Sequence, residues 1–276
     1  MNENFIMGFG FIGLGSIIGL CLTVIFPFIG FLKLIDEDTL QCKECPIIDN
    51  CISYKNFFGG QSKWLFECPF ISFLLLKKTC RYKCRVSTLI GPILLIETNG
   101  MVYLTIYILL GNSYTTLVYC LCSSMLISLS IIDWKTQYIP IEFNLIILIL
   151  GGVRLLLNFD NCLEYIIGLF AVSGFLLLID VFGSKIMHRD GVIGGGDIKL
   201  MAAAGLLLGW KLDLLALILG CILGAIIHSI IMRFKKSGHV LAFGPYLSMG
   251  IFIAMIWGEQ LVGWYLSIAG FEKLAY

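Results

Sequence analysis

Long apolar segments separated by short polar connections constrain this chain more than any other feature of its sequence. The 276 residues are 59% hydrophobic and 13% charged, and the mean hydropathy is +0.94. A soluble domain is about 45–50% apolar and about 25% charged, and a helix needs about 20 apolar residues to cross a bilayer. The composition therefore excludes an ordinary soluble protein. It predicts an all-α, polytopic membrane helical bundle with about eight transmembrane helices.

The apolar segments divide the chain into three predicted parts. The predicted spans are roughly 5–32, 89–110, 114–132, 142–158, 164–183, 197–210, 214–232 and 240–258, of which 197–210 is short for a crossing. The parts are a first transmembrane helix, residues 1–32, a small cysteine-rich insertion, residues 33–88, and a transmembrane domain, residues 89–276. The first apolar run lacks the basic start of a signal peptide and exceeds its usual length, so we expect it to remain in the protein.

Basic residues are distributed unevenly between the two predicted sides of the membrane. The insertion alone holds nine of the 19 Lys and Arg residues. If it is cytoplasmic, eight crossings place seven further basic residues on its side and leave three on the other. Cytoplasmic segments carry the excess of Lys and Arg, so the charge pattern predicts a cytoplasmic insertion. It also puts Asp133 and Asp197 at the cytoplasmic face.

These two aspartates lie at the edges of apolar segments, where a carboxylate is costly and marks a candidate functional site. Asp133 closes one apolar run, and we expect the chain to leave the helix at about this residue, turn at the surface, and re-enter near Ile141, after Ile139-Pro140. Asp197 follows Gly194-Gly195-Gly196 and opens the next helix. Each has a structural alternative, because Asp133 can mark the end of a span and Asp197 can cap a helix. Brought together, the two carboxyl groups would share one proton.

Cysteines are concentrated in the insertion. Six of the eleven lie there, namely Cys42, Cys45, Cys51, Cys68, Cys80 and Cys84. Disulfides are rare in the cytoplasm, so metal binding is the better interpretation, and a domain of this size usually needs such support. We predict a structural, four-thiolate zinc site made by Cys42, Cys45, Cys80 and Cys84. A different four of the six, or reduced thiols without metal, remain alternatives.

The aspartate segments resemble the motifs of the type IV prepilin leader peptidases, which are intramembrane aspartic proteases. Gly194-Gly195-Gly196-Asp197-Ile198-Lys199 fits the signature Gly-x-Gly-Asp-x-Lys, and Asp133 with Ile139-Pro140 fits the second aspartate motif of one branch. Ala242-Phe243-Gly244-Pro245-Tyr246-Leu247 is a further resemblance. The likeness runs in one order from about residue 40 to 257. In the insertion, Cys42 and Cys45 keep the family's Cys-x-x-Cys spacing, whereas Cys80 and Cys84 have three residues between them.

The resemblance implies an endopeptidase of the bacterial inner membrane. It would cleave the leader from type IV prepilin or pseudopilin-like precursors at the cytoplasmic face. Its catalytic pair would be Asp133 and Asp197, supported by Gly194, Gly196, Lys199 and Pro140. Many members then methylate the new amino terminus with S-adenosylmethionine. The segment Lys77-Lys78-Thr79-Cys80 departs from the family's Arg-Gly-Lys-Cys, so proteolysis is the stronger of the two expectations.

Two other functions fit parts of the sequence. One is an intramembrane aspartic protease with a different substrate, although those branches generally lack a cysteine-rich loop. The other is a transporter that uses Asp133, Asp197 and Asp180 as an ion pathway, although these acids are predicted near one face. The partners expected from the composition are the lipid bilayer, whose anionic headgroups would attract the basic insertion, and no nucleic acid.

The zinc prediction is tested by metal analysis of the purified protein. About one zinc per chain is expected from four thiolate ligands, and replacing Cys42 and Cys45 with serine should remove it. Serine at Cys120, which lies in an apolar segment, is the matched control and should leave the zinc content unchanged. Fully folded and active protein without zinc would exclude a structural site.

Overall fold

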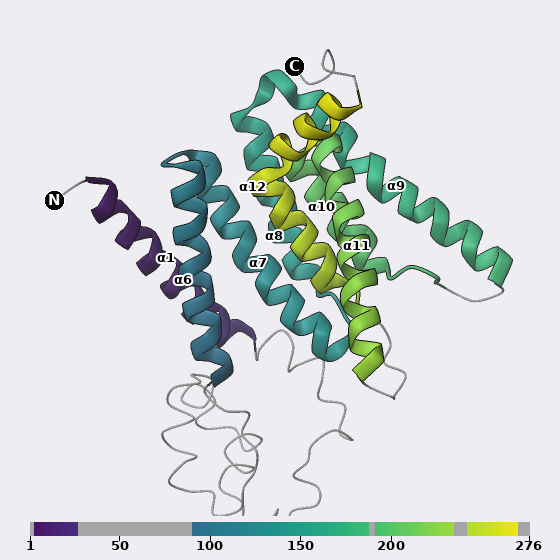
Figure 1. The fold of residues 1–276 in the computed structure, drawn as a ribbon, viewed down its shortest axis with the longest axis horizontal. Coiled ribbons are helices and arrows are strands. Elements are labelled where there is room, and N and C mark those ends of the chain that lie inside the picture. Colours follow the sequence, from purple (N-terminus) through teal and green to yellow (C-terminus); the bar gives the residue numbers. More distant parts are fainter. Residues whose placement is uncertain (1–2, 27–89, 188–190, 235–241, 270–276) are drawn as a thin grey trace, which may run out of the picture. The chain divides into compact units, whose positions relative to one another are not determined.

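The computed structural model describes residues 3–26, 90–187, 191–234 and 242–269, and every regular element in these ranges is a helix (Figure 1). The elements are α1 (Glu3–Phe26), α6 (Ile90–Leu110), α7 (Tyr114–Thr136), α8 (Ile141–Leu157), the 3-10 helix η4 (Phe159–Asn161), α9 (Cys162–Met187), α10 (Gly195–Leu208), α11 (Trp210–Phe234) and α12 (Gly244–Ile268). Each predicted span corresponds to one α-helix, which confirms the all-α prediction. The predicted insertion, 33–88, lies outside the described residues.

The chain divides into two compact units, residues 1–105 and 106–276. In the first unit α1 packs on α6, and the Asn99 side-chain amide donates a hydrogen bond to the Gly15 carbonyl at 2.8 Å. The approach is close, since a Cβ added at Gly19 would lie 2.9 Å from the Ile96 Cα. Small residues at such a crossing let the two backbones meet in an apolar environment.

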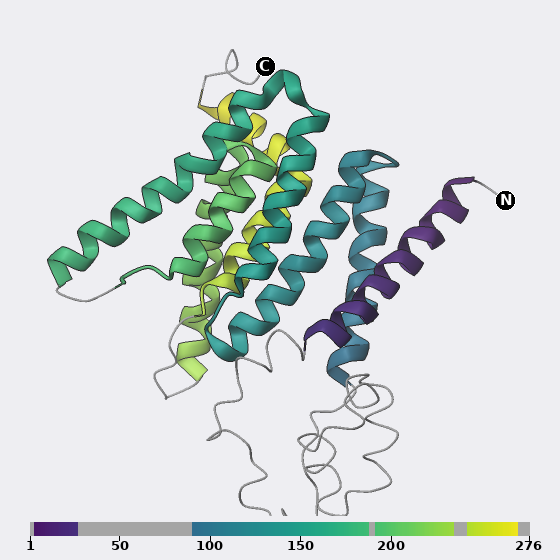
Figure 2. The same ribbon diagram turned by 180° about the vertical axis from the view of Figure 1, so that it is seen from behind.

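The second unit is arranged around α10, which packs against α8, α9, α11 and α12 (Figures 1 and 2). Its apolar side chains are almost fully buried, as those of Leu200, Met201, Ala203, Ala204 and Leu207 show. Where α10 crosses α9, the backbones of Gly205 and Gly168 leave no room for a side chain. The helix that carries Asp197 is therefore enclosed by protein.

Four helices in the described ranges are long and apolar enough to cross a membrane. Their apolar stretches are Tyr114–Trp134, Phe159–Ile186, Trp210–Arg233 and Gly244–Ile268. The structure differs from prediction at 197–210, because α10 has only 14 residues and would cover about 21 Å at 1.5 Å per residue. That is less than the roughly 30 Å of a hydrocarbon core. By length and composition, a multi-pass membrane protein is confirmed, with four of the eight predicted crossings.

Exposed aromatic residues lie at both ends of the second unit. Trp134 and Tyr138 lie where α7 ends, and Tyr114 and Trp210 lie at the opposite end, where α7 and α11 begin. Tyr and Trp gather at the two membrane–water interfaces. The 23 residues of α7 correspond to about 34 Å, which matches the separation of two such interfaces.

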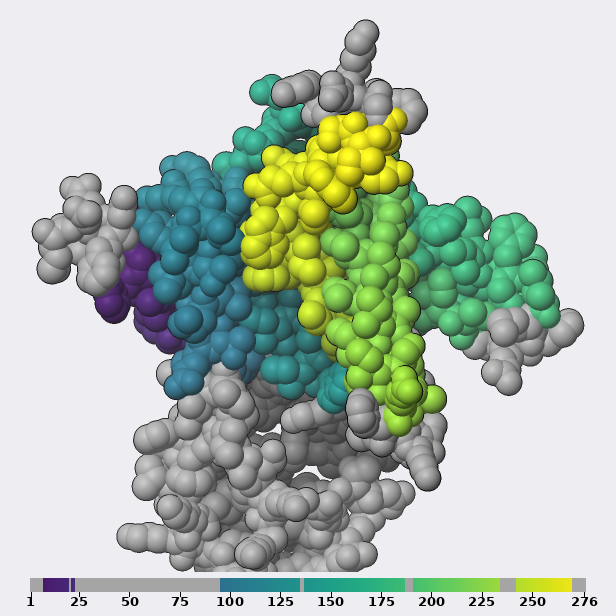
Figure 3. All heavy atoms as spheres, in the orientation of Figure 1, coloured from purple at the N-terminus to yellow at the C-terminus, as the bar shows by residue number. Residues whose placement is uncertain are grey.

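The second half of α9 extends away from the neighbouring helices of its unit (Figures 1 and 2). It exposes Phe175, Leu178, Phe182 and Ile186, and in the space-filling view it projects to one side, while α11 and α12 cover one face together (Figure 3). Apolar side chains exposed in this way would contact lipid. The projecting half also carries Asp180, which reaches back to the start of α10.

Candidate functional site

Asp133 lies within the last turn of α7, so the helix ends three residues later than the predicted exit at about Asp133. The helix continues to Thr136, and Gln137 ends it in the left-handed conformation (φ 54°), where its amide donates to the Asp133 carbonyl at 2.8 Å. The Asp133 side chain is only 4% exposed. Its Oδ2 accepts a hydrogen bond from the Gly244 amide at 2.9 Å, which links the end of α7 to the start of α12.

Asp197 lies in the first turn of α10, three residues after the N-cap residue Gly194. Its backbone amide donates to the Gly194 carbonyl at 2.9 Å. The alternative that Asp197 caps the helix is not observed, since the N-cap is Gly194 without a side-chain cap hydrogen bond. The Asp197 Oδ1 is buried without a hydrogen-bond partner. A buried acceptor left unpaired by the protein is costly, so this atom is available to water or to a ligand.

Ile139, in the turn between α7 and α8, contacts the surroundings of both aspartates. A Cβ added at Gly196 would lie 2.8 Å from the Ile139 Cβ, and one added at Gly244 would lie 3.2 Å from its Cδ1. Gly196 directly precedes Asp197, and Gly244 holds Asp133. The structure thus brings the two predicted aspartates to one place, which we call the aspartate end. There the end of α7 meets the starts of α8, α10 and α12.

The electrostatics of Asp197 reflect this environment. Asp197 lies in α10, outside the four long apolar helices. Burial, and secondarily the negative charge of Asp133, raises the pKa of Asp197 to about 7 from its ordinary value of 3.8. The positive end of the α10 dipole favours the ionised form, so burial is the stronger effect here. A pKa of about 7 means that Asp197 is mostly protonated a unit below neutral pH and loses its proton as the pH passes 7.

The other predicted site residues have different environments. Pro140 is buried and forms the N-cap of α8, whereas Gly194 and Lys199 are exposed and Gly196 is half-buried. Because Lys199 is exposed, its side chain suits an anchor of α10 at the membrane–water interface better than a cation directed at the Asp133 and Asp197 carboxyl groups. The six cysteines of the insertion lie outside the described residues, and the described ranges contain no group of three or more metal-ligating side chains.

Asn144 is a residue of this site that the sequence reasoning missed. It is 5% exposed, its side-chain amide donates to the Gly196 carbonyl at 3.4 Å, and its Oδ1 is buried without a partner. The signal in the sequence is a second polar residue, after Glu142, in the first turn of a segment that is apolar from Leu145 to Leu150. In the sequence, Gly244 stands out only as part of the segment 242–247, which resembles a family motif. Its hydrogen bond to Asp133 is seen only in the tertiary structure.

Asp180 holds the segment that leads to Asp197. Its Oδ1 accepts hydrogen bonds from the amides of Val192 and Ile193, at 2.7 and 2.8 Å. A Cβ added at Gly183, one turn further along α9, would lie 3.3 Å from the Val192 side chain. The Asp180 carboxylate thus fixes backbone at the approach to the glycine segment, an arrangement that suits a positioning residue better than a step in an ion pathway.

Comparison with known proteins finds a family and several proteins with similar sequences. The sequence profile of the Type IV leader peptidase family matches residues 120–229. A prepilin leader peptidase/N-methyltransferase of Aeromonas salmonicida (strain A449) is 31% identical over 208 residues, which cover 74% of this chain and 70% of that protein. A protein of the same name from Pseudomonas aeruginosa is 35% identical over 154 residues, 53% of this chain and 51% of that protein. No solved structure matches.

Removing the Asp180 carboxylate should loosen the segment before Asp197. Asp180→Ala leaves two amides without their acceptor, so Val192 and Ile193 should exchange hydrogen about tenfold faster or more, since bonds to charged groups contribute about 1.5–3 kcal/mol. Asp180→Asn keeps one oxygen acceptor and should retain part of the protection. Hydrogen-exchange mass spectrometry of peptides covering 191–196 measures both. Asp160→Ala, at an exposed acid of η4, is the matched control, and unchanged exchange in Asp180→Ala would contradict the assignment.

Proposed function

This chain belongs to the type IV leader peptidase family, and from that membership we propose that it is a membrane aspartic endopeptidase that removes the leader from type IV prepilin or pseudopilin-like precursors. The observation that carries the proposal is the meeting of Asp133 and Asp197. They are 64 positions apart in the sequence, yet both lie around Ile139 at one end of the helical bundle. One is held by a backbone amide, and the other has an unpaired buried oxygen.

The proposed chemistry uses the shared proton. The ionised carboxyl takes a proton from a water molecule as the water oxygen attacks the scissile carbonyl, and the protonated carboxyl gives its proton to the carbonyl oxygen. As the tetrahedral intermediate collapses, one of its hydroxyls returns a proton to the pair, the C–N bond breaks and the leaving amine takes a proton from the pair. The pair is left singly protonated, as at the start. The two acids act as a unit and titrate together, so the roles of base and acid belong to the pair.

The glycines beside Asp197 suit a peptide substrate. Gly195 is exposed, and a Cβ there would meet nothing within 4 Å. Gly194 is also exposed, but a Cβ there would lie 2.8 Å from the Asp197 Oδ2. Without side chains at these positions, the backbone of a substrate has room to approach the Asp197 carboxyl. Gly194 and Gly196 are thus proposed as supporting residues, with Pro140 fixing the turn that carries Ile139 and Asn144 holding the Gly196 carbonyl.

The aspartate end is proposed to face the cytoplasm of a bacterium. The charge distribution supports this orientation, because four basic residues of the helices belong to the aspartate end, namely Lys135, Lys185, Lys199 and Arg233. Only Arg154 and Lys211 lie at the opposite end. Cytoplasmic segments hold the excess of basic residues. In this orientation the pair would meet a leader peptide that has not crossed the inner membrane.

Methylation of the new amino terminus is proposed as a second activity, because it forms part of the relatives' names. The methyl donor expected from the resemblance is S-adenosylmethionine. A pocket beside Arg154 in the described residues does not fit this role. Tyr119 lines it, 14 residues before Asp133 on α7, or about 21 Å along the helix, too far from the aspartates for a newly cleaved end. The predicted zinc site lies outside the described residues and has the metal analysis above as its test.

Loss of either aspartate should abolish processing. Asp133→Ala and Asp197→Ala should each lower the rate of prepilin cleavage by about 10²–10⁴-fold, the usual contribution of a general acid or base. The measurement is the size of a co-expressed prepilin on gels, with the level of the membrane-inserted enzyme followed in parallel. Asp160→Ala, at an exposed acid of the opposite end, is the matched control. Substantial processing by either aspartate variant would remove that residue from the mechanism.

Cleavage should depend on pH through the pair. Because the pKa of Asp197 is raised to about 7, the singly protonated pair should be lost as the pH rises past this value and the second proton leaves. In acid both carboxyls become protonated and the base is lost, so the rate should pass through a maximum on the acid side of about pH 7. The purified enzyme is assayed from pH 4 to 9, and recovery on return to pH 6 excludes denaturation. A rate that keeps rising above pH 8 would refute a shared proton.

A further inference from the structure

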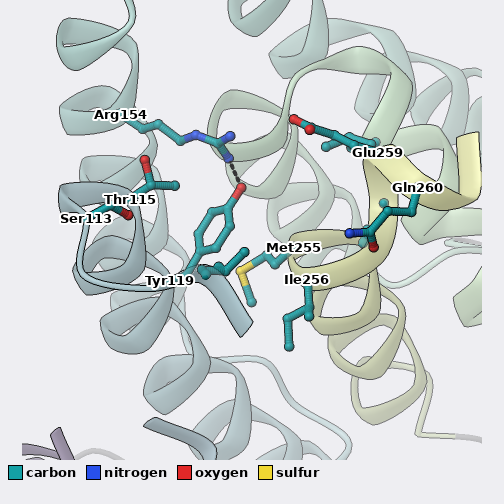
Figure 4. Close-up of a pocket in the computed structure, with 12 residues that line it drawn as sticks. Ser113, Thr115, Tyr119, Arg154, Met255, Ile256, Glu259 and Gln260 are labelled. Carbon is teal, nitrogen blue, oxygen red and sulfur yellow. Dashed lines mark hydrogen bonds between the residues drawn. The ribbon is translucent and has the colours of Figure 1, made fainter. Parts of the chain in front are cut away.

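A pocket at the end of the second unit opposite the aspartates has no role in the proposed cleavage. It has a volume of about 200 Å³. It lies between the start of α7 and the second half of α12, and the end of α8 lies beside it (Figure 4). Its polar lining consists of Ser113, Thr115, Tyr119, Arg154, Glu259 and Gln260. We call it the Arg154 pocket.

Arg154 is a buried cation whose contacts within the pocket are neutral. Its guanidinium donates to the Tyr119 hydroxyl and to the Leu207 carbonyl, the latter at 2.9 Å, and it stacks over the rings of Tyr119 and Tyr165 at 4.8 and 5.6 Å. The side chain is 9% exposed, and its Nε is buried without a partner. A buried charge is costly unless an opposite charge compensates it, so this site favours an anion.

Glu259 makes the pocket dipolar. Arg154 and Glu259 point toward one another from opposite walls (Figure 4). Within the described residues, the ion pair at this end joins Lys211 to Glu164 at 3.7 Å and not Arg154 to Glu259. A simple anion would face the repulsion of Glu259, and a simple cation that of Arg154. The ligand that satisfies both walls carries an anionic and a cationic group a short distance apart.

The depth of the pocket in the membrane points to the source of such a ligand. Tyr114 and Trp210, exposed at this end, and Trp257, exposed on α12 two residues before Glu259, are the aromatic residues expected at headgroup level. The polar atoms of the pocket therefore lie where a bilayer presents its phosphates and amines. Guanidinium and phosphate form strong charge-assisted hydrogen bonds.

We propose that the Arg154 pocket binds the headgroup of an aminophospholipid, with the phosphate at Arg154 and the primary ammonium at Glu259. Gln260, Ser113 and Thr115 supply neutral hydrogen-bonding groups around it. The pocket is thus a lipid site in the leaflet opposite the aspartate pair. It is independent of the cleavage chemistry, because none of its residues contributes to the aspartate end.

Native mass spectrometry of the full chain in mild detergent tests this assignment. The wild-type protein, offered equal amounts of phosphatidylethanolamine and phosphatidylglycerol, should retain the former about tenfold more, as expected for one additional charge-assisted contact. Glu259→Gln should abolish that preference, because the ammonium loses its partner. Glu259 is exposed, so this variant is expected to fold. Glu164→Gln removes a carboxylate at the same end outside the pocket and should keep the preference.

The phosphate half of the proposal is tested with Arg154→Gln, which should lower retention of both lipids about tenfold or more. If that variant does not fold, Glu259→Gln decides the question alone. Equal retention of the two lipids by the wild-type protein, or an unchanged preference in Glu259→Gln, would overturn the proposal. Competition with soluble phosphoethanolamine distinguishes a lipid site from a site for the free headgroup. If phosphoethanolamine displaces the lipid at equal concentration, the lipid site is overturned; if the lipid stays bound, the lipid site is supported.

Discussion

The hydrogen bond from the Gly244 amide to the Asp133 carboxylate is the contact on which the aspartate end depends. It joins the last turn of α7 to the first turn of α12, and there is no space for a side chain at Gly244, since a Cβ would lie 2.6 Å from the Asp133 Oδ2. Ile139 fills the gap between this contact and Gly196. A buried carboxylate is tolerated because a backbone donor satisfies one oxygen, and the same burial lets it act electrostatically on Asp197.

The buried ionisable groups at the two ends of the second unit are stabilised in different ways. At the aspartate end, two carboxyl groups lie near one another, and burial together with the Asp133 charge raises the pKa of Asp197; in the proposed function they share a proton. At the opposite end, the single cation Arg154 is held by neutral acceptors and aromatic rings. Asp213, fully buried on α11 with both oxygens unpaired, adds a further ionisable group in the interior. The enclosed helix α10 runs between the two ends, packed against α8, α9, α11 and α12.

Much of the fold follows from simple rules of sequence. Each apolar run became one α-helix, and the turn at Ile139-Pro140 places the start of α8 at Ile141, as predicted from proline chemistry. Local sequence patterns predict helix ends and short helices less well, because tertiary packing determines where these elements end. Residues 134–136 continue α7 beyond Asp133, and the 14-residue α10 is stable because surrounding helices bury it, not because it is long enough to cross a membrane alone. Hydrophobic periodicity also does not predict the role of Asn144, because its hydrogen-bond acceptor, the Gly196 carbonyl, lies on another helix.

The sequence by itself determined that this chain is a helical membrane protein and that Asp133 and Asp197 are its most unusual residues. Apolar length and the cost of a carboxylate beside hydrocarbon are local properties, which a linear reading detects. Only the tertiary structure decided that these acids meet around Ile139, that Asp180 holds the approach to Asp197, and that Arg154 and Glu259 face one another across a pocket. Such contacts join residues remote in the chain, and their geometry depends on how closely the helices pack.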